Sequence, residues 1–462
     1  MIKVYLDWNV ISGMKQGHQP DFVEILNRKD QFQVIYSTSH ISDILVSYNG
    51  KEEQNAIINE DLEYISSLTN NTCASIVKDK AVIEVYDPKA MFDYRVESRN
   101  YLNGEGLFDS FLRDYEPDSP VYQAITKLLE LPVPTLLSEV LNNPNTASAM
   151  NQYYPVLADN PTFGHLINVT WKRIRALNEN ESYKELRNTL QTGLDIKPNQ
   201  LFNAHANPFD EIDKRHKRLE KRTGAKMAHA IANSGEYSPP WFQEIYGNYI
   251  KLDMHGYQED RIRVDDKHKE TMRNTIDDGF HAAFASMCNF YITSDKKSSW
   301  KTKQVFKKLD INTTVLTPTE FIDYYNIYLK YNDISEHIQL WLDLINSDQY
   351  ISTEEKAGQL FTFNLNHFLF DYFNRGYILQ SESGTSILLT QSKPTNNALV
   401  SNVEIANVAN KLNYIFGVDK VIDASDINFE NPIRYEWKLG KLIYTLVLIN
   451  NYLQLYLDVE AP

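Results

Sequence analysis

Four aspartates occupy positions from which an open parallel sheet can build a site. Residues just past the carboxyl ends of parallel strands converge on one crevice. Four carboxylates in such a crevice would raise one another's pKa unless a cation neutralised them. Their oxygen atoms suit the hard ions Mg²⁺ and Mn²⁺, which activate water for the hydrolysis of phosphodiesters. The four residues are Asp7, Asp43, Asp278 and Asp295.

The elements that must position these acids are short strands and helices at both ends of the first 320 residues. Their alternation implies parallel pairing and an α/β sheet. Asp7 and Asp295 then follow strands directly. Asp43 lies one helical turn into the helix after the second strand, and Asp278 opens a helix. We predict strands at Ile2–Leu6, Phe32–Tyr36, Phe290–Thr293 and Thr314–Leu316, and helices at Thr275–Met287 and Lys301–Leu309.

The order of these motifs resembles the PIN-domain family of nucleases. The first strand ends in Leu6-Asp7-Trp8-Asn9, and Asp43 lies in the helix after the next strand. The sequence Asp278-Gly-Phe-His281-Ala282 precedes a strand that ends in Ile292-Thr293-Ser294-Asp295. The resemblance covers residues 1–60 and 265–322. Asp43 departs from the commoner Glu, and Trp8 replaces a residue that is usually small.

The resemblance implies that Asp7, Asp43, Asp278 and Asp295 are catalytic and bind one or two divalent ions, Mg²⁺ or Mn²⁺. Asn9 and Ser294 would support them through hydrogen bonds. His281 could orient a nearby carboxylate, and a helix-face histidine packed against the sheet is at least an equal interpretation. Asp277 competes with Asp278 as the third acid, and we prefer Asp278 because it places His281 at i+3 on the same helical face. For any one aspartate after a strand, a helix N-cap or solvated turn is the commoner role.

Basic residues gather in two islands of a chain whose net charge is −15, from 46 basic and 61 acidic residues. Because the overall field repels phosphate, contacts with nucleic acid must be local. The first island, Lys214–Lys226, could contact the phosphate backbone of a nucleic acid or could simply be a solvated helix face, and we weigh the two interpretations equally. The second island, Lys296–Lys308, begins beside Asp295, and we predict that it binds substrate. The predicted substrate contacts are Lys296, Lys297, Lys301 and Lys303.

The composition is that of a folded globular protein, with 42% hydrophobic and 23% charged residues. Two cysteines are too few for a disulfide framework or a thiolate zinc site, which suits a reducing compartment. The N-terminal segment reaches Asp7 without an apolar signal region. The longest uncharged apolar stretch, Leu442–Leu457, is shorter than the roughly 20 residues of a membrane helix. We therefore expect a cytoplasmic protein with no membrane partner.

The fold class predicted is α/β: a PIN-like parallel sheet flanked by helices, with a mainly α-helical insertion and a mainly α-helical C-terminal domain. Residues 1–60 and 265–322 would form the discontinuous PIN-like domain, residues 61–264 the insertion and residues 323–462 the C-terminal domain. In the last of these, Gly358–Phe373 has helical spacing and Leu442–Leu457 is expected to close the chain as an apolar helix. The insertion helices are predicted at Val121–Leu131, Thr135–Leu141, Thr162–Leu177 and Tyr183–Leu190.

The resemblance implies a metal-dependent endonuclease that leaves a 5′-phosphate, with RNA as the favoured substrate and single-stranded or flap DNA left open. The helical additions would control substrate access or bind a regulatory protein. By analogy with the family, a toxin or antiviral defence effector is a reasonable setting. The alternatives are a non-catalytic interaction scaffold, which would not bind Mn²⁺ stoichiometrically, and a structure-specific DNA nuclease.

Overall fold

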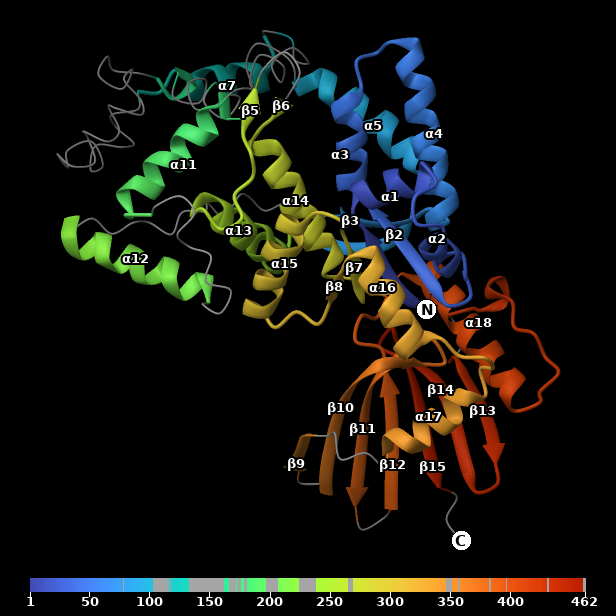
Figure 1. The fold of residues 1–462 in the computed structure, drawn as a ribbon. Helices are drawn as coiled ribbons and strands as arrows, with labels where there is room; N and C mark the ends of the chain where they lie inside the picture. Colours follow the sequence, from blue (N-terminus) through green and yellow to red (C-terminus); the bar gives the residue numbers. More distant parts are fainter. Residues whose placement is uncertain are drawn as a thin grey trace. The chain divides into compact units, whose positions relative to one another are not determined.

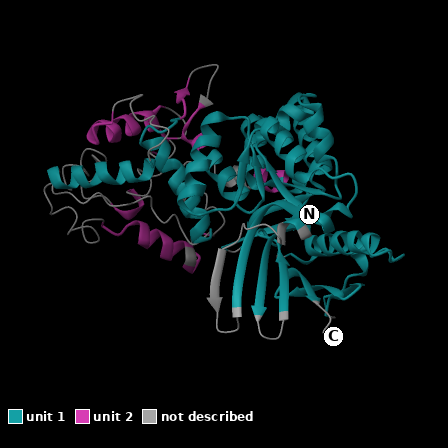
Figure 2. Ribbon diagram, turned by 60° about the horizontal axis from the view of Figure 1, so that its bottom comes forward, with its two compact units in different colours: residues 1–91, 202–259, 276–462 teal, residues 92–201, 260–275 magenta. Residues whose placement is uncertain are grey.

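A computed structural model gives the fold. It describes residues 1–77, 79–102, 116, 118–132, 162–165, 172, 176–177, 181–196, 207–223, 238–264, 269–345, 351–355, 358–381, 384–395, 397–429 and 432–459. The chain divides into two compact units, which Figure 2 distinguishes by colour. The first contains residues 1–91, 202–259 and 276–462, and the second contains residues 92–201 and 260–275.

A six-stranded, mostly parallel sheet lies in the first unit, in the order β4-β3-β2-β1-β7-β8 (Figure 1). Only β4 runs antiparallel to its neighbour. The predicted α/β class and all four predicted strands are confirmed. The strands are β1 (Ile2–Leu6), β2 (Phe32–Ser37), β3 (Thr72–Val77), β4 (Lys80–Val85), β7 (Phe290–Ile292) and β8 (Thr314–Leu316).

The sheet continues beyond residue 60, where the predicted insertion was expected to begin. Helix α4 leads into β3 and β4, which complete one edge of the sheet. The helices associated with this part of the chain are α1 (Trp8–Lys15), α2 (Pro20–Leu26), α3 (Thr38–Ser47), α4 (Glu52–Thr69), α12 (Pro208–Thr223), α13 (Pro240–Met254), α14 (Met272–Ala285), α15 (Lys296–Lys308), α16 (Pro318–Tyr324) and the π-helix η2 (Tyr325–Leu329).

The second unit holds residues 92–201 and 260–275, whereas α12 and α13, which also fall within the predicted insertion, belong to the first unit. The predicted helices at Val121–Leu131 and Tyr183–Leu190 are found as α7 (Pro120–Leu129) and α11 (Ser182–Gly193). The helix predicted at Thr135–Leu141, and most of that at Thr162–Leu177, lie outside the described residues. The unit also contains most of α5 (Pro88–Leu102) and the short strands β5 (Arg263–Val264) and β6 (Lys269–Glu270).

The prediction of a mainly helical C-terminal domain is wrong, because its main element is a seven-stranded antiparallel sheet in the order β13-β14-β15-β12-β11-β10-β9. Helices α17 (Glu336–Ile345) and α18 (Ala398–Ile415) and the 3₁₀ turn η3 (Ala424–Asp426) accompany it. The strands are β9 (Ile351–Glu355), β10 (Gly358–Leu369), β11 (Phe373–Ser381), β12 (Gly384–Thr390), β13 (Arg434–Leu439), β14 (Leu442–Ile449) and β15 (Tyr452–Val459).

Two sequence features explain this correction. The predicted helix at Gly358–Phe373 is mostly β10, in which Phe361, Phe363 and Leu365 alternate with polar residues at the strand period of two. The predicted helix at Leu442–Leu457 is the β14–β15 hairpin. Its turn residues, Asn450 and Asn451, both have positive φ, 51° and 66°, as a tight hairpin turn requires.

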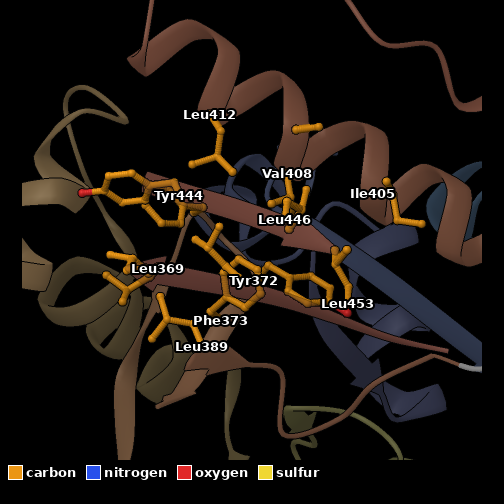
Figure 3. Close-up of a cluster of buried hydrophobic side chains, with 14 of the residues drawn as sticks. Leu369, Tyr372, Phe373, Leu389, Ile405, Val408, Leu412, Tyr444, Leu446 and Leu453 are labelled. Atoms are coloured by element: carbon orange, nitrogen blue, oxygen red, sulfur yellow. The ribbon is translucent and has the colours of Figure 1, made fainter. Parts of the chain in front are cut away.

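Helix α18 packs its apolar side chains against this antiparallel sheet (Figure 3). Leu412 and Ile405 from the helix meet Tyr444 and Leu446 from β14 in one buried cluster. Opposite Phe363, β11 carries Gly376, where a Cβ atom would lie 2.0 Å from the phenyl ring. A glycine is therefore the residue that the packing admits at this position.

Buried polar contacts join the C-terminal sheet region to the parallel sheet within the first unit. The Lys3 ammonium of β1 lies 2.8 Å from the Glu404 carboxylate of α18, and both side chains are buried. Asn289, just before β7, donates to the Gln391 side chain at 3.2 Å. Among the described residues, every helix is too short or too polar to span a bilayer.

Candidate functional site

The carboxyl ends of β1 and β7 define the site. The chain winds outward from β1 through β2 and β3 on one side, while β7 and β8 lie on the other. Such a reversal opens a crevice beyond the carboxyl ends of the strands, where α/β folds bind their ligands. Asp7 follows β1, and its backbone N–H donates to the Ile292 carbonyl of β7 at 2.8 Å. The first predicted acid therefore lies at the switch point.

Asp7 is held by two side chains at this edge of the sheet. The Thr293 hydroxyl donates to Asp7 Oδ2 at 2.6 Å, and the Asn9 amide donates to the same oxygen at 2.8 Å. Asn9 Oδ1 in turn accepts from the Ser294 backbone N–H at 3.3 Å. Asp7 is 5% exposed, so its orientation is fixed by these contacts and not by solvent. Ser294 thus takes part through its backbone, whereas the neighbouring Thr293 makes the side-chain contact.

Asp43 pairs with His281 across the crevice. Asp43 Oδ2 lies 2.8 Å from His281 Nε2, and His281 Nδ1 lies 2.8 Å from the Tyr5 hydroxyl. The Tyr5 oxygen is 2.6 Å from Ser37 Oγ, at the cap of α3. His281 is 2% exposed and Asp43 is 22% exposed. The histidine therefore connects the second acid to the buried end of β1.

The other two acids belong to α14 and α15. Asp278 Oδ2 accepts a hydrogen bond from the Tyr249 hydroxyl of α13 at 3.3 Å. Asp295 is exposed and caps α15, where its Oδ1 accepts from the backbone N–H groups of Lys297 and Ser298 at 2.6 and 2.9 Å. For Asp295 the structure therefore contains the helix-cap role that is common for an aspartate after a strand.

The charges of all four acids reach this region. Burial raises the pKa of Asp7, and the carboxylates of Asp43 and Asp295 raise it further, while His281 acts in the opposite direction. Burial alone would lower the pKa of His281, but Asp43, with smaller contributions from Asp7 and Asp278, raises it to about 9. His281 is therefore a buried cation at neutral pH among acids brought together from four segments of the chain.

The donor chemistry fits a hard divalent ion, because carboxylate oxygens are its preferred ligands. Within the described part of the chain, however, no three acidic, histidine or cysteine side chains converge on a point that could hold a metal ion. Their oxygens instead contact Thr293, Asn9, His281, Tyr249 and the amides of α15.

The predicted substrate lysines have different environments. Lys296 and Lys303 are exposed, and Lys297 is partly buried with its Nζ donating to the Glu259 carbonyl at 2.7 Å. Lys301 is wrongly predicted as a substrate contact, because it is fully buried with its Nζ 3.4 Å from the equally buried Asp253 carboxylate. Its position on the inner face of α15 explains the burial.

Sequence reasoning missed three residues that orient the acids: Thr293, Tyr5 and Tyr249. Thr293 directly precedes Ser294 in the recognised motif, so its position within that motif was the available signal. Tyr249 reaches Asp278 from a helix 29 residues earlier. Only the packing of α13 against α14, where Phe242 and Tyr246 meet Phe280, reveals that contact. Tyr5 is a strand residue, and nothing in its local sequence separates it from a core aromatic.

His40 provides a pH-dependent test of the site's architecture. Its Nδ1 accepts from the Ser37 backbone N–H at 2.9 Å, so its Nε2–H donates to the Leu6 carbonyl at 2.7 Å. Burial, and then the charge of His281, lower the pKa of His40 to about 3. Because an unfolded histidine titrates near 6.5, the unfolded state binds more protons between about pH 6.5 and 3, and stability falls as the pH falls.

We expect His40 to contribute up to about 1.4 kcal/mol of lost unfolding free energy per pH unit in that window. Urea unfolding at pH 7, 6, 5 and 4.5 should show a flatter profile for His40→Gln than for the wild type. Glutamine keeps a donor and an acceptor but does not titrate. Parallel profiles for the two proteins would contradict a buried neutral His40.

Comparisons of the chain with protein-family models, with curated proteins and with solved structures return no match. The functional assignment therefore depends on the residues of the chain and their geometry.

Proposed function

We propose that this protein is a divalent-metal-dependent endonuclease of the PIN-like type that hydrolyses phosphodiester bonds, with RNA favoured over DNA as substrate. The observation that carries the proposal is the buried Asp7 at the sheet's switch point, with the charges of Asp43, Asp278 and Asp295 around it. Burying a carboxylate costs free energy unless hydrogen-bond donors or a cation stabilise its charge. A divalent ion bound for phosphodiester cleavage would supply that cation.

The chain's own residues would divide the work as follows. Asp7, Asp43, Asp278 and Asp295 would hold Mg²⁺ or Mn²⁺, which supplies Lewis-acid activation of water and neutralises charge on the phosphate. Thr293 and Asn9 keep Asp7 oriented toward the crevice. His281 partly offsets the repulsion among the acids until a metal is present, because it is protonated at neutral pH.

The test is a cleavage panel on the wild-type protein. Labelled single-stranded RNA, tRNA, single-stranded DNA and flap DNA are incubated with Mn²⁺, with Mg²⁺ or with EDTA. We expect cutting of RNA with either metal and none with EDTA. Thermal unfolding with Mn²⁺ should show stabilisation by about 2.7 kcal/mol at one hundred times Kd. No cutting together with no stabilisation would overturn the proposal.

One observation favours the alternative of a non-catalytic scaffold. Asp43 already has a buried cationic partner at 2.8 Å, so part of the acidic charge is compensated within the protein. A scaffold would show no stabilisation by Mn²⁺ and no cleavage, while a nuclease that awaits an activating partner would bind Mn²⁺ without cutting. The metal titration therefore separates the two functions even when no substrate is cleaved.

A further inference from the structure

One face of α15 presents cations and an aromatic side chain to solvent. Its residues stand at positions i, i+4, i+7 and i+11, which align on a single helical face. The lysines are exposed, and the tryptophan, which stacks on Tyr257 with ring centroids 6.1 Å apart, is partly exposed. This face begins next to Asp295, the cap of the helix. We call it the α15 stripe: Lys296, Trp300, Lys303 and Lys307.

A second helix, α12, is fixed to the same unit through its opposite face. The Phe209 ring lies 4.2 Å from Lys308 Nζ at the end of α15. Asp213 Oδ1 accepts from Lys251 at 2.9 Å. Further along, His216 Nε2 lies 2.7 Å from the Nε2 of His255, which follows α13. These three contacts are spaced at i, i+4 and i+7, so one face of α12 packs against α13 and α15.

The face of α12 turned away from these contacts is basic. Four exposed cations stand at i, i+3, i+4 and i+7, and no acid falls among these positions. The acids of α12 cluster nearer its start, where Asp210 and Glu211 occupy the first turn. The order of the charges also complements the helix dipole, and Asp210 stands one turn before Lys214 on the same face. We call this face the α12 stripe: Lys214, Lys217, Arg218 and Lys221.

The two stripes follow one another. The α15 stripe runs from Lys296, next to Asp295, to Lys307 over about 16 Å at 1.5 Å per residue. Beside its end, Lys308 contacts Phe209, and the α12 stripe starts five residues beyond Phe209 and extends for about 10 Å. The helices can be followed from their labels in Figure 1. The contact between Lys308 and Phe209 thus places the end of α15 beside the start of α12.

We propose that the α15 and α12 stripes form one binding track for single-stranded RNA that delivers the strand to the acids. This inference rests on the proposed function and names the part of the protein that holds the substrate. Lysine and arginine would bind successive phosphates, while Trp300 offers a base a stacking surface. An acidic protein segment would match the charges but would have no use for the aromatic ring placed between lysines.

The experiment measures binding and not cleavage. A fluorescent 30-nucleotide oligouridylate RNA is titrated with the Asp7→Asn protein in EDTA, from 50 to 200 mM KCl. Lys217, Arg218 and Lys221 are then replaced by Glu in that background. We expect at least tenfold weaker binding at 50 mM KCl. We also expect the slope of log Kd against log salt to fall by about 2, from 0.7 for each of three lost contacts.

A matched control carries the same charge change elsewhere. Replacing the exposed Lys330, Lys420 and Lys441 by Glu should leave the slope unchanged, since these residues lie outside both stripes. Trp300→Ala should weaken binding at least about fivefold, and Trp300→Phe should restore most of it because the stacking surface returns. Circular dichroism and thermal melting confirm that each variant is folded.

Three results would overturn the track: an unchanged slope in the α12 variant, an equal effect from the control variant, or equally tight binding of a polyglutamate peptide. These outcomes are separate from failure of the proposed function. A protein that binds RNA through the stripes but neither binds Mn²⁺ nor cuts would retain the track and lose the nuclease. A protein that still binds and cuts RNA as before, although the three α12 cations are replaced by Glu, would retain the nuclease and lose the track.

Discussion

Asp7→Asn is expected to reduce metal-dependent cleavage by about 10³-fold or more, which corresponds to a rise in the activation barrier of about 4 kcal/mol. Asparagine keeps the shape of the side chain and an oxygen that can accept from Thr293 and Asn9, as Asp7 Oδ2 does. It removes the negative charge at the switch point, and with it a carboxylate ligand that would attract a divalent ion. The loss should appear in cleavage rate and in Mn²⁺ affinity together.

The fold should tolerate this substitution. Because burial raises the pKa of Asp7, the ionised form is disfavoured in the folded protein, and a neutral side chain of the same size should change the unfolding free energy by no more than about 1 kcal/mol. Asp323→Asn, at an exposed acid on α16, is the matched control and should keep full activity. Full Mn²⁺-dependent cleavage by Asp7→Asn would remove Asp7 from the site.

The parallel sheet was predictable because the local sequence of its strands is enriched in apolar and β-branched residues. Ile2–Leu6 is apolar at every position except Lys3 and is followed by an acid, as expected for a strand buried on both faces. The C-terminal sheet was not, because the aromatic residues of β10 satisfy the helical spacing and the strand alternation at the same time. Asn450 and Asn451 look like interruptions of a helix until pairing across the turn assigns them positive φ.

The candidate site divides in the same way. The places of Asp7 and Asp295 could be predicted because each follows a strand, and parallel strands bring such residues to one edge of the sheet. The groups that orient them, such as Tyr249 on Asp278, depend on how helices distant in the sequence pack together. Lys301 failed as a prediction for that reason. The local sequence shows a basic helix, but only the neighbour α13 decides which of its lysines is buried.

Lys301→Met is expected to lower the unfolding free energy by about 3 to 5 kcal/mol, because it leaves Asp253 as a buried charge without its cation. Both side chains are 0% exposed, and the Lys301 ammonium also lies 4.6 Å from the centre of the Tyr249 ring. Asp253→Asn should lower the unfolding free energy by a similar amount, because it removes the carboxylate that faces the buried Lys301 ammonium. Urea unfolding of each variant at pH 7 measures both values.

The double variant Lys301→Met/Asp253→Asn decides whether the pair or the individual side chains matter. If the two groups stabilise the fold chiefly by neutralising each other, the double variant should lose at least about 2 kcal/mol less than the sum of the single losses. Additive losses would contradict a coupled pair. Because Tyr249 contacts both Lys301 and Asp278, the Mn²⁺ affinity of the same variants connects this buried pair to the site. If the double variant regains stability but not Mn²⁺ affinity, the main role of the pair is to hold Tyr249 against Asp278. If it regains both, the main role of the pair is to stabilise the contact between α13 and α15.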